Sequence, residues 1–363
     1  MKHNWEYKKL GEVCDIYQPK TISTTMLVEN GKYPVYGANG IIGKYDKYNH
    51  QEKELLMTCR GATCGSINVS QPYSWINGNA MVIHPLHDNI VFDFLKYQLM
   101  TLNLSCIVTG AAQPQITRQS LTPILIPLPP LPVQERIVEE LDRLSLILEK
   151  KKQQIKELDS LAQSIFYDMF GDPIENEKDW EVKKLGEVGE IVTGSTPSTT
   201  DNTNWNGKIN WVTPAELSNQ LFYGATQRRL TEKGAKNLTL MPVGTVLLSS
   251  RAPIGKIAIT TQPMCCNQGF KNIICGEYLN NIFLYYYLLI TLENIKALGC
   301  GATFKEVSKK AIYSYETILP PLDLQQSFAK KIEVIEKQKE LINQSIKEVQ
   351  LLFDAKMDYY FGD

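Results

Sequence analysis

Two arginines in matching segments of the chain are the residues best suited to contact a nucleic acid. Arg60 lies in residues 55–69 (LLMTCRGATCGSINV), and Arg251 lies in residues 247–260 (LLSSRAPIGKIAIT). A guanidinium can bind a phosphate or pair with guanine, so this residue type serves both backbone binding and base reading. For each arginine taken alone, a structural salt bridge or a surface charge is an equally good explanation.

A second pair of matching segments adds weaker candidates. Residues 109–117 (TGAAQPQIT) parallel residues 299–308 (GCGATFKEVS), which places Thr117 opposite Ser308. Glutamine can pair with adenine, and a basic side chain can neutralise a phosphate. The candidates in or directly after these segments are Gln113, Gln115, Arg118, Thr303, Lys305 and Lys309.

Sequence motifs of catalysis are missing. There is no GxxxxGK[ST] phosphate loop, no GxGxxG fingerprint, no GxSxG elbow and no HExxH helix. We also find no [ND]PP[YF] tetrapeptide of amino-methyltransferases and no carboxylate–lysine cluster of nucleases. The 8 cysteines form no CxxC pair, which predicts free thiols rather than a zinc site. The sequence therefore predicts a non-catalytic protein that binds no metal.

The net charge of the chain does not indicate nucleic-acid binding. The chain has 38 Lys and Arg against 39 Asp and Glu. Residues 1–132 and 173–323 are mildly basic, whereas the two segments that follow them are acidic, which is compatible with a local phosphate-facing patch. The apolar stretches are too short to span a membrane, and the first residues are polar and charged. We expect a soluble, cytoplasmic protein.

The chain contains two copies of one unit. WEYKKLGEV begins at Trp5 and WEVKKLGEV at Trp180; LPPLPVQE begins at Leu128 and LPPLDLQQ at Leu319. Both copies close on the tripeptide FGD. The starts are 175 positions apart and the ends 191, so the second interior is longer by 16 residues. Matching frames around different interiors predict a pseudo-two-fold molecule that could read two halves of one extended ligand.

The interiors of the copies are of mixed α and β type. Runs such as GKIAIT and NAMVIHPL predict short strands, and NIVFDFLKYQLM and NIFLYYYLLITL predict helices. The copies differ most in residues 33–49 and 193–217, which are rich in Asn, Gly, Thr and aromatic residues. Such side chains suit hydrogen bonding and stacking in a DNA groove, but for any single loop an ordinary turn is the better explanation.

A long helix is predicted at the end of each copy. Residues 133–170 contain neither Gly nor Pro, and their apolar residues follow a seven-residue period. The same period is found in register in the second copy, 191 positions later. A 37-residue helix is about 55 Å long. Two such helices can bury their seams against each other as an antiparallel pair; the alternative is that each helix packs on its own globular unit. The predicted seam residues are Ile137, Leu141, Leu144, Leu148, Ile155, Leu158, Ile165, Phe328, Ile332, Ile335, Ile342, Ile346, Val349 and Phe353.

These features together resemble the specificity (S) subunit of type I restriction–modification systems. The resemblance covers essentially the whole chain and rests on the paired WE[YV]KKLGEV and LPPL motifs, on YPVYGANGIIGKY, TGSTPST, INWVTPAEL and SSRAPIGKIAI, and on the helix after each block. It implies two target-recognition domains of the α/β (α+β) class, joined by two long helices that form an antiparallel coiled coil. The implied boundaries are 1–132 for the first domain, 133–172 for the central helix, 173–323 for the second domain and 324–363 for the last helix.

The resemblance also implies partners and cofactors. Each domain would read one half of a bipartite double-stranded DNA site, while the coiled coil sets the spacer and docks two methyltransferase (M) subunits. Two restriction (R) subunits would join in the full complex. S-adenosylmethionine would be bound by the methyltransferase partner, and ATP and Mg by the restriction partner, so this chain would hold no cofactor.

Two other functions remain open from the residues alone. The chain could be the recognition module of a single-chain restriction–methylation enzyme whose catalytic part is missing. It could also be a structural or protein-binding scaffold that uses the same two-fold form. Sequence-specific DNA protection with a separate methyltransferase would distinguish the S-subunit hypothesis from both.

Overall fold

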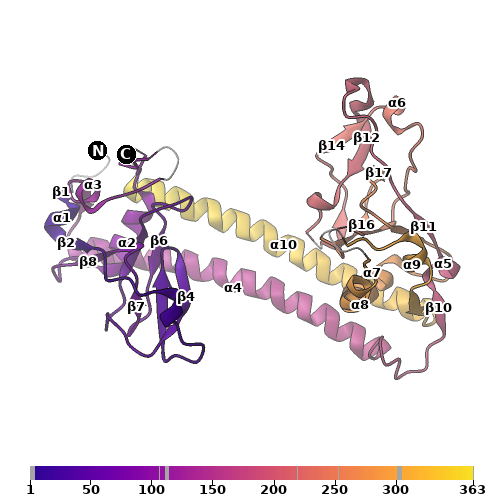
Figure 1. The fold of residues 1–363 in the computed structure, drawn as a ribbon, viewed down its shortest axis with the longest axis horizontal. Helices are drawn as coiled ribbons and strands as arrows, with labels where there is room; N and C mark the ends of the chain where they lie inside the picture. The colour runs from indigo at the N-terminus through magenta and orange to yellow at the C-terminus, as the bar shows by residue number, and fades with distance from the viewer. Residues whose placement is uncertain are drawn as a thin grey trace. The chain divides into compact units, whose positions relative to one another are not determined.

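The chain divides into two units that repeat one order of elements. The computed structural model describes residues 5–105, 107–110, 114–218, 220–251, 253–300 and 305–362. One unit comprises Met1–Lys152 with Gln344–Asp363, and the other comprises Gln153–Asn343. Each unit contains one globular domain and a part of both long helices (Figure 1).

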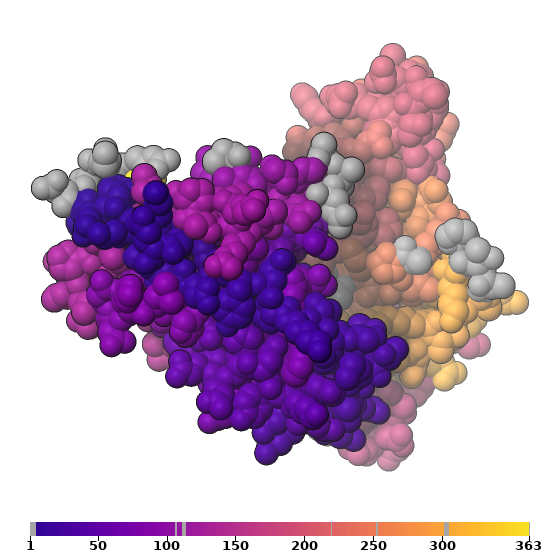
Figure 2. Space-filling model, turned by 60° about the vertical axis from the view of Figure 1, so that its left-hand side comes forward, coloured from indigo at the N-terminus to yellow at the C-terminus, as the bar shows by residue number. Residues whose placement is uncertain are grey.

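The first globular domain is built on three sheets. β1 pairs with β9, a four-stranded sheet has the order β2-β8-β5-β6, and a three-stranded sheet has the order β4-β3-β7. In the space-filling view its indigo and violet residues form one continuous body (Figure 2). The strands are β1 (Glu6–Lys9), β2 (Cys14–Tyr17), β3 (Tyr33–Gly37), β4 (Gly40–Tyr45), β5 (Leu55–Thr58), β6 (Ile67–Val69), β7 (Trp75–Ile76), β8 (Ala80–Pro85) and β9 (Leu125–Leu128). The helices are α1 (Leu10–Val13), η1 (Thr24–Met26), α2 (Phe92–Thr101) and α3 (Arg118–Leu121).

The second globular domain repeats this plan with additions. β10 pairs with β19, and the larger sheets have the orders β11-β18-β15-β16-β13 and β14-β12-β17. The strands are β10 (Val182–Lys184), β11 (Gly189–Val192), β12 (Trp205–Val212), β13 (Phe222–Tyr223), β14 (Arg228–Leu230), β15 (Val246–Leu248), β16 (Ile257–Thr260), β17 (Met264–Cys266), β18 (Asn272–Cys275) and β19 (Glu316–Ile318). The helices are α5 (Leu185–Val188), η2 (Asn202–Asn204), η3 (Pro214–Glu216), α6 (Glu232–Ala235), α7 (Asn281–Ile290), α8 (Leu292–Ala297) and α9 (Lys309–Tyr313).

The central strands of each domain are covered on both faces. In β5, Leu55 and Met57 join one hydrophobic cluster, whereas Leu56 joins another with Tyr36 and Ile76. In the second domain, β15 divides its residues between two clusters in the same alternating way. Side chains alternate along a strand, so a run without charged residues such as LLMT buries both of its faces.

The repeated LGEV motif has a structural cause. In α1 the carboxylate of Glu12 accepts the backbone N–H of Lys9 at 3.1 Å, and in α5 that of Glu187 accepts the N–H of Lys184 at 3.1 Å. Each pair closes the first turn of a four-residue helix. The glycine of the motif allows close packing, because a Cβ on Gly186 would lie 2.0 Å from the ring of Tyr313.

A buried glutamine ties each long helix to its domain. The side chain of Gln134 accepts the backbone N–H of Val91, the residue before α2, at 2.9 Å, and donates to the carbonyls of Asn89 and Pro129 at 2.9 and 2.8 Å. Gln325 makes the three equivalent bonds in the second unit, to Asn280, Tyr278 and Pro320. Both side chains are fully buried, so the LPPL-containing motif fixes where each helix leaves its domain.

The two long helices, α4 (Leu131–Phe170) and α10 (Leu322–Phe361), pack together in opposite directions, as predicted. In the first unit the start of α4 meets the end of α10, where Lys356 pairs with Glu140 at 2.7 Å. In the second unit the end of α4 meets the start of α10, where Lys339 pairs with Asp159 at 2.7 Å. None of the 14 predicted seam residues is exposed. Both helices begin two residues before the predicted boundaries at residues 133 and 324; in α4 the first turn tolerates Pro132 because it needs no N–H donor there.

Aromatic residues anchor the helix ends. The ring of Phe170 lies 4.9 Å from that of Phe283 on α7, and the ring of Phe361 lies 5.4 Å from that of Phe94 on α2. The alternative that each helix packs on its own domain is therefore correct for the helix starts only. The end of each helix belongs to the unit that contains the other domain.

Candidate nucleic-acid interface

Three loops of the first domain converge around Arg60. The N–H of Cys59 donates to the carbonyl of Asn79 at 3.3 Å, and the N–H of Ile116 donates to the carbonyl of Cys59 at 2.9 Å. Arg60 itself forms an isolated bridge with Gln115. The segments that sequence analysis matched between the copies are thus brought together at one place.

The second domain holds Arg251 in the same backbone arrangement. The N–H of Ser250 donates to the carbonyl of Gly269 at 2.8 Å, and the N–H of Val307 donates to the carbonyl of Ser250 at 2.9 Å. Arg251 forms an isolated bridge with Glu306, as Arg60 does with Gln115. The two arginines therefore occupy equivalent positions in two copies of one loop scaffold.

The charges around Arg251 form a connected group. Its Nε lies 2.9 Å from Oε2 of Glu306, while Nζ of Lys271 lies 3.1 Å from Oε1 of the same carboxylate. Lys271 also donates to Oγ of Ser250 at 3.1 Å, and its side chain is only 8% exposed, against 49% for Arg251. Burial alone would raise the pKa of Glu306, but the bonds from Lys271 and Arg251 outweigh it and hold that pKa below its usual range.

Neutral residues occupy the same positions around Arg60. Gln115 stands where the second domain has Glu306, and Met81, which pairs with Met57 on β5, stands where it has Lys271. Among the described residues, the exposed side chain of Arg60 has no ion-pair partner. Arg251 therefore forms the salt bridge that was the alternative explanation for both arginines. Arg60 forms none with the described residues.

The second-rank candidates are less uniform. Gln113 and Thr303 lie outside the described residues. The backbone of Gln115 exchanges hydrogen bonds with Thr109 at 2.8 and 2.9 Å, and exposed Lys305 follows in the corresponding loop. Arg118 opens α3, where Nη2 lies 3.9 Å from the carboxylate of Asp15.

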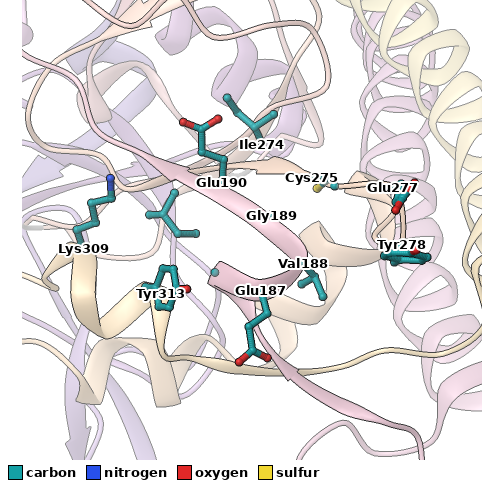
Figure 3. A pocket seen from close by; sticks show the side chains of 13 residues that line it. Glu187, Val188, Gly189, Glu190, Ile274, Cys275, Glu277, Tyr278, Lys309 and Tyr313 are labelled. Atoms are coloured by element: carbon teal, nitrogen blue, oxygen red, sulfur yellow. The ribbon is translucent and has the colours of Figure 1, made fainter.

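Lys309 opens α9 and lines a groove of about 660 Å³ in the second domain (Figure 3). Figure 3 shows Lys309 and Tyr313 on α9 beside strand β11, with Glu187, Glu190 and Glu277 also on the rim. Three carboxylates repel phosphate, so this groove is poorly suited to DNA. Lys309 is consequently a weaker candidate than Arg251.

Sequence reasoning missed Lys271 and Glu306. The available signal was a lysine next to the buried strand β18, at a place where the first copy has methionine. The divergent segment 33–49 contains the hairpin of β3 and β4, where Asn68 donates to Asn39 at 3.1 Å and Thr58 donates to the carbonyl of Ala38. Its neighbours Ile41 and Ile42 are exposed.

An aromatic cluster lies in the longer interior of the second domain, where sequence reasoning named the segment 193–217 but missed Arg228. The guanidinium of Arg228 lies 3.5 Å from the ring centre of Trp205, whose ring packs against that of Trp211. This stacked arginine is a further exposed cation, on strand β14 at the edge of the sheet β14-β12-β17. Over the described part of the chain we find no group of three metal-ligating side chains and no helix long and apolar enough to cross a membrane.

Known proteins match most of this chain. The family described as type I restriction modification DNA specificity domain matches residues 2–158 and 177–351. The specificity subunit of the type I restriction enzyme MjaIX from Methanocaldococcus jannaschii is 37% identical over 189 residues, which are 50% of this chain and 43% of that protein. The chain thus spans less than half the length of this relative. The putative MjaX specificity subunit of the same organism is 28% identical over 377 residues, covering 96% of this chain and 83% of that protein.

Two solved structures share the fold. The S subunit of a type I restriction–modification system from M. genitalium gives a TM-score of 0.63 at 16% identity and covers 99% of this chain and 96% of that one. A chain from a study of complex assembly and conformational transition in the type I system gives 0.60 at 20% identity, covering 98% and 97%. Both likenesses concern the fold alone.

Proposed function

Since this chain belongs to the type I restriction–modification DNA specificity family, we propose that each of its globular domains reads one half of a bipartite DNA site. It is the DNA specificity subunit of such a system and leaves catalysis to its partners. The observation that carries the proposal is the pair of equivalent loop scaffolds around Arg60 and Arg251. One backbone arrangement with two different sets of side chains is what two different half-sites require.

The helix pair is the proposed docking surface for two methyltransferase subunits. Leu161 in the second unit and Leu352 in the first stand at equivalent helix positions and are 47% and 48% exposed. In the second unit a groove of about 510 Å³ lies between the helices, with Leu161 and Leu341 on its rim. Exposed leucines along a helix suit burial by helices of another protein.

The cofactors follow from this division of labour. S-adenosylmethionine would be bound by the methyltransferase partner, and ATP and Mg by the restriction partner. This chain would position DNA by contacts to phosphates and base edges and would choose which adenine the partner can reach. The complex is expected to work in the cytoplasm.

The test is methylome sequencing of cells that express this chain with a type I methyltransferase partner. We expect methylation at one asymmetric bipartite motif with a spacer of undefined sequence. Cells with the partner alone serve as the control. Methylation of a continuous motif, or no sequence-specific methylation from an assembled complex, would show that the proposal is wrong.

A further inference from the structure

We propose that Arg251 reads a base in the half-site bound by the second domain, with guanine as its preferred partner. Glu306 and Lys271 hold Arg251 in position, whereas Arg60 of the first domain binds a phosphate. This inference rests on the proposed function, because it requires that both loop scaffolds face DNA.

The geometry leaves the reading edge of Arg251 available. Its Nε lies 2.9 Å from Oε2 of Glu306, and no hydrogen bond found within the described residues uses its two terminal nitrogens. Guanine offers O6 and N7 side by side in the major groove, and two parallel donors of a guanidinium match that pair. A side chain that is half exposed and held at its inner nitrogen can present these donors in a fixed direction.

The carboxylate of Glu306 is itself held. Lys271 binds its other oxygen, and Lys271 is nearly buried and bonded to Ser250. Glu306 therefore has little freedom to follow a moving arginine. Positioning of this kind removes conformational entropy before DNA arrives, so less is lost on binding.

A phosphate role fits Arg251 less well than Arg60. The charge nearest to the guanidinium of Arg251 is the carboxylate of Glu306, which weakens its attraction for a phosphate, although Lys271 compensates part of that negative charge. Among the described residues no ion pair brings a carboxylate to Arg60, and Gln115 and Met81 occupy the equivalent positions. The same scaffold thus carries a restrained arginine in one domain and an unrestrained one in the other.

The decisive variant is Arg251→Lys in the full chain, expressed with its methyltransferase partner and read out by methylome sequencing. Lysine keeps the charge but has no planar pair of donors. We expect about 5- to 150-fold less discrimination at one base position of one half-site, the value of one bidentate contact. The other half-site should be unchanged. Arg60→Lys is the matched control and should leave both half-sites as they are.

A second variant tests the positioning residues. The double substitution Glu306→Gln with Lys271→Met installs the residues that the first domain carries on the same backbone, so it is expected to fold. It should relax the same base position as Arg251→Lys. A purely structural role would instead lower methylation at all sites without changing the motif.

The outcomes separate the two proposals. If Arg251→Lys keeps full discrimination, and Arg251→Ala only lowers methylation equally at all sites as Arg60→Ala does, Arg251 is a phosphate contact and the inference is wrong. If the unmodified chain directs no bipartite methylation, the proposed function fails before any variant is compared.

Discussion

At the scale of single residues, the two buried glutamines show how a short motif fixes a junction. Gln134 satisfies one N–H and two carbonyls; its bond to Pro129 is buried, and those to Val91 and Asn89 are partly buried. The requirement for all three bonds explains why glutamine recurs at position 325 although the motif around it changes from LPPLPVQE to LPPLDLQQ. The glutamine acts locally, at the junction between the helix and its domain. The prolines before it restrict the backbone, so another residue could not easily reach the same three partners.

We expect Gln134→Ala to destabilise the first unit by about 3 kcal/mol, because unsatisfied buried groups cost about 1–3 kcal/mol each and partial relaxation offsets some of the loss. Gln326→Ala is the control, since that neighbour of Gln325 is exposed. Chemical denaturation followed by circular dichroism measures both. Equal stability of the two variants would mean that water replaces the glutamine.

The group around Glu306 predicts a dependence on pH. A carboxyl whose pKa is lower in the folded protein stabilises the fold above its ordinary value of 4.5. That contribution is lost as the pH falls through the folded value. Between pH 7 and pH 3 the unmodified chain should therefore lose more unfolding free energy than the Glu306→Gln, Lys271→Met variant. Denaturation curves of both proteins at the two pH values measure this difference. An identical loss of unfolding free energy in both would show that Glu306 does not contribute to the pH dependence.

At the scale of elements, local patterns predicted the long helices α4 and α10, the helices α2 and α7, and the strands β8 and β16. A seven-residue period without Gly or Pro is a strong signal, and it located α4 and α10 to within two residues of their starts. The sequence did not predict which strands pair, because pairings such as those of β8 with β2 and with β5 depend on residues far apart in the chain. The extra elements β13 and α6 of the second domain were also missed, since they have only 2 and 4 residues, too few for a periodic pattern.

The prediction also left out aromatic residues at the helix ends. A strict seam omitted Phe166 and Phe170, yet both are fully buried between α7 and α10. Where a helix enters a domain core, more of its face is apolar than where it packs on one partner helix. A repeat with two apolar positions in seven does not include these extra residues.

Phe170→Ala should cost about 3–5 kcal/mol of the stability of the second unit, as expected for a large ring removed from a packed core. Its ring contacts those of Phe166, Phe283 and Phe328. Tyr167→Ala serves as control, because that side chain is exposed. A denaturation midpoint that moves equally in both variants would contradict the core role of Phe170.

At the scale of the whole molecule, the two loop clusters draw on separate parts of the chain. All described residues around Arg60 lie between Cys59 and Ile116, and those around Arg251 lie between Ser250 and Val307. Replacing residues 1–132 by the same segment of a relative should therefore change one half of the methylated motif. Methylome sequencing of the chimaera measures this, and a change in both halves would show that the domains do not read independently.

The spacer is predicted to depend on the long helices. Inserting four residues after Lys151 adds about 6 Å to α4, or about two base-pair steps of 3.4 Å. The seam is already interrupted at Lys151, so the loss of packing should be small. We expect unchanged half-sites and a spacer longer by about one or two base pairs. Methylation at the original spacing by a folded, partner-bound variant would show that the helices do not set the distance.

The end of α10 packs in the core of the first domain, and this affects the order in which the domains can fold during synthesis. Met357 and Phe361 belong to the core that contains Phe94, and Tyr360 bonds to Glu140 from 220 positions away. A ribosome has therefore translated the whole second domain before the first can complete its core. Until then the nascent first domain exposes the apolar face of α2, which is the kind of surface that chaperones hold. A premature stop codon late in α10 would accordingly harm the domain made first and spare the one made last.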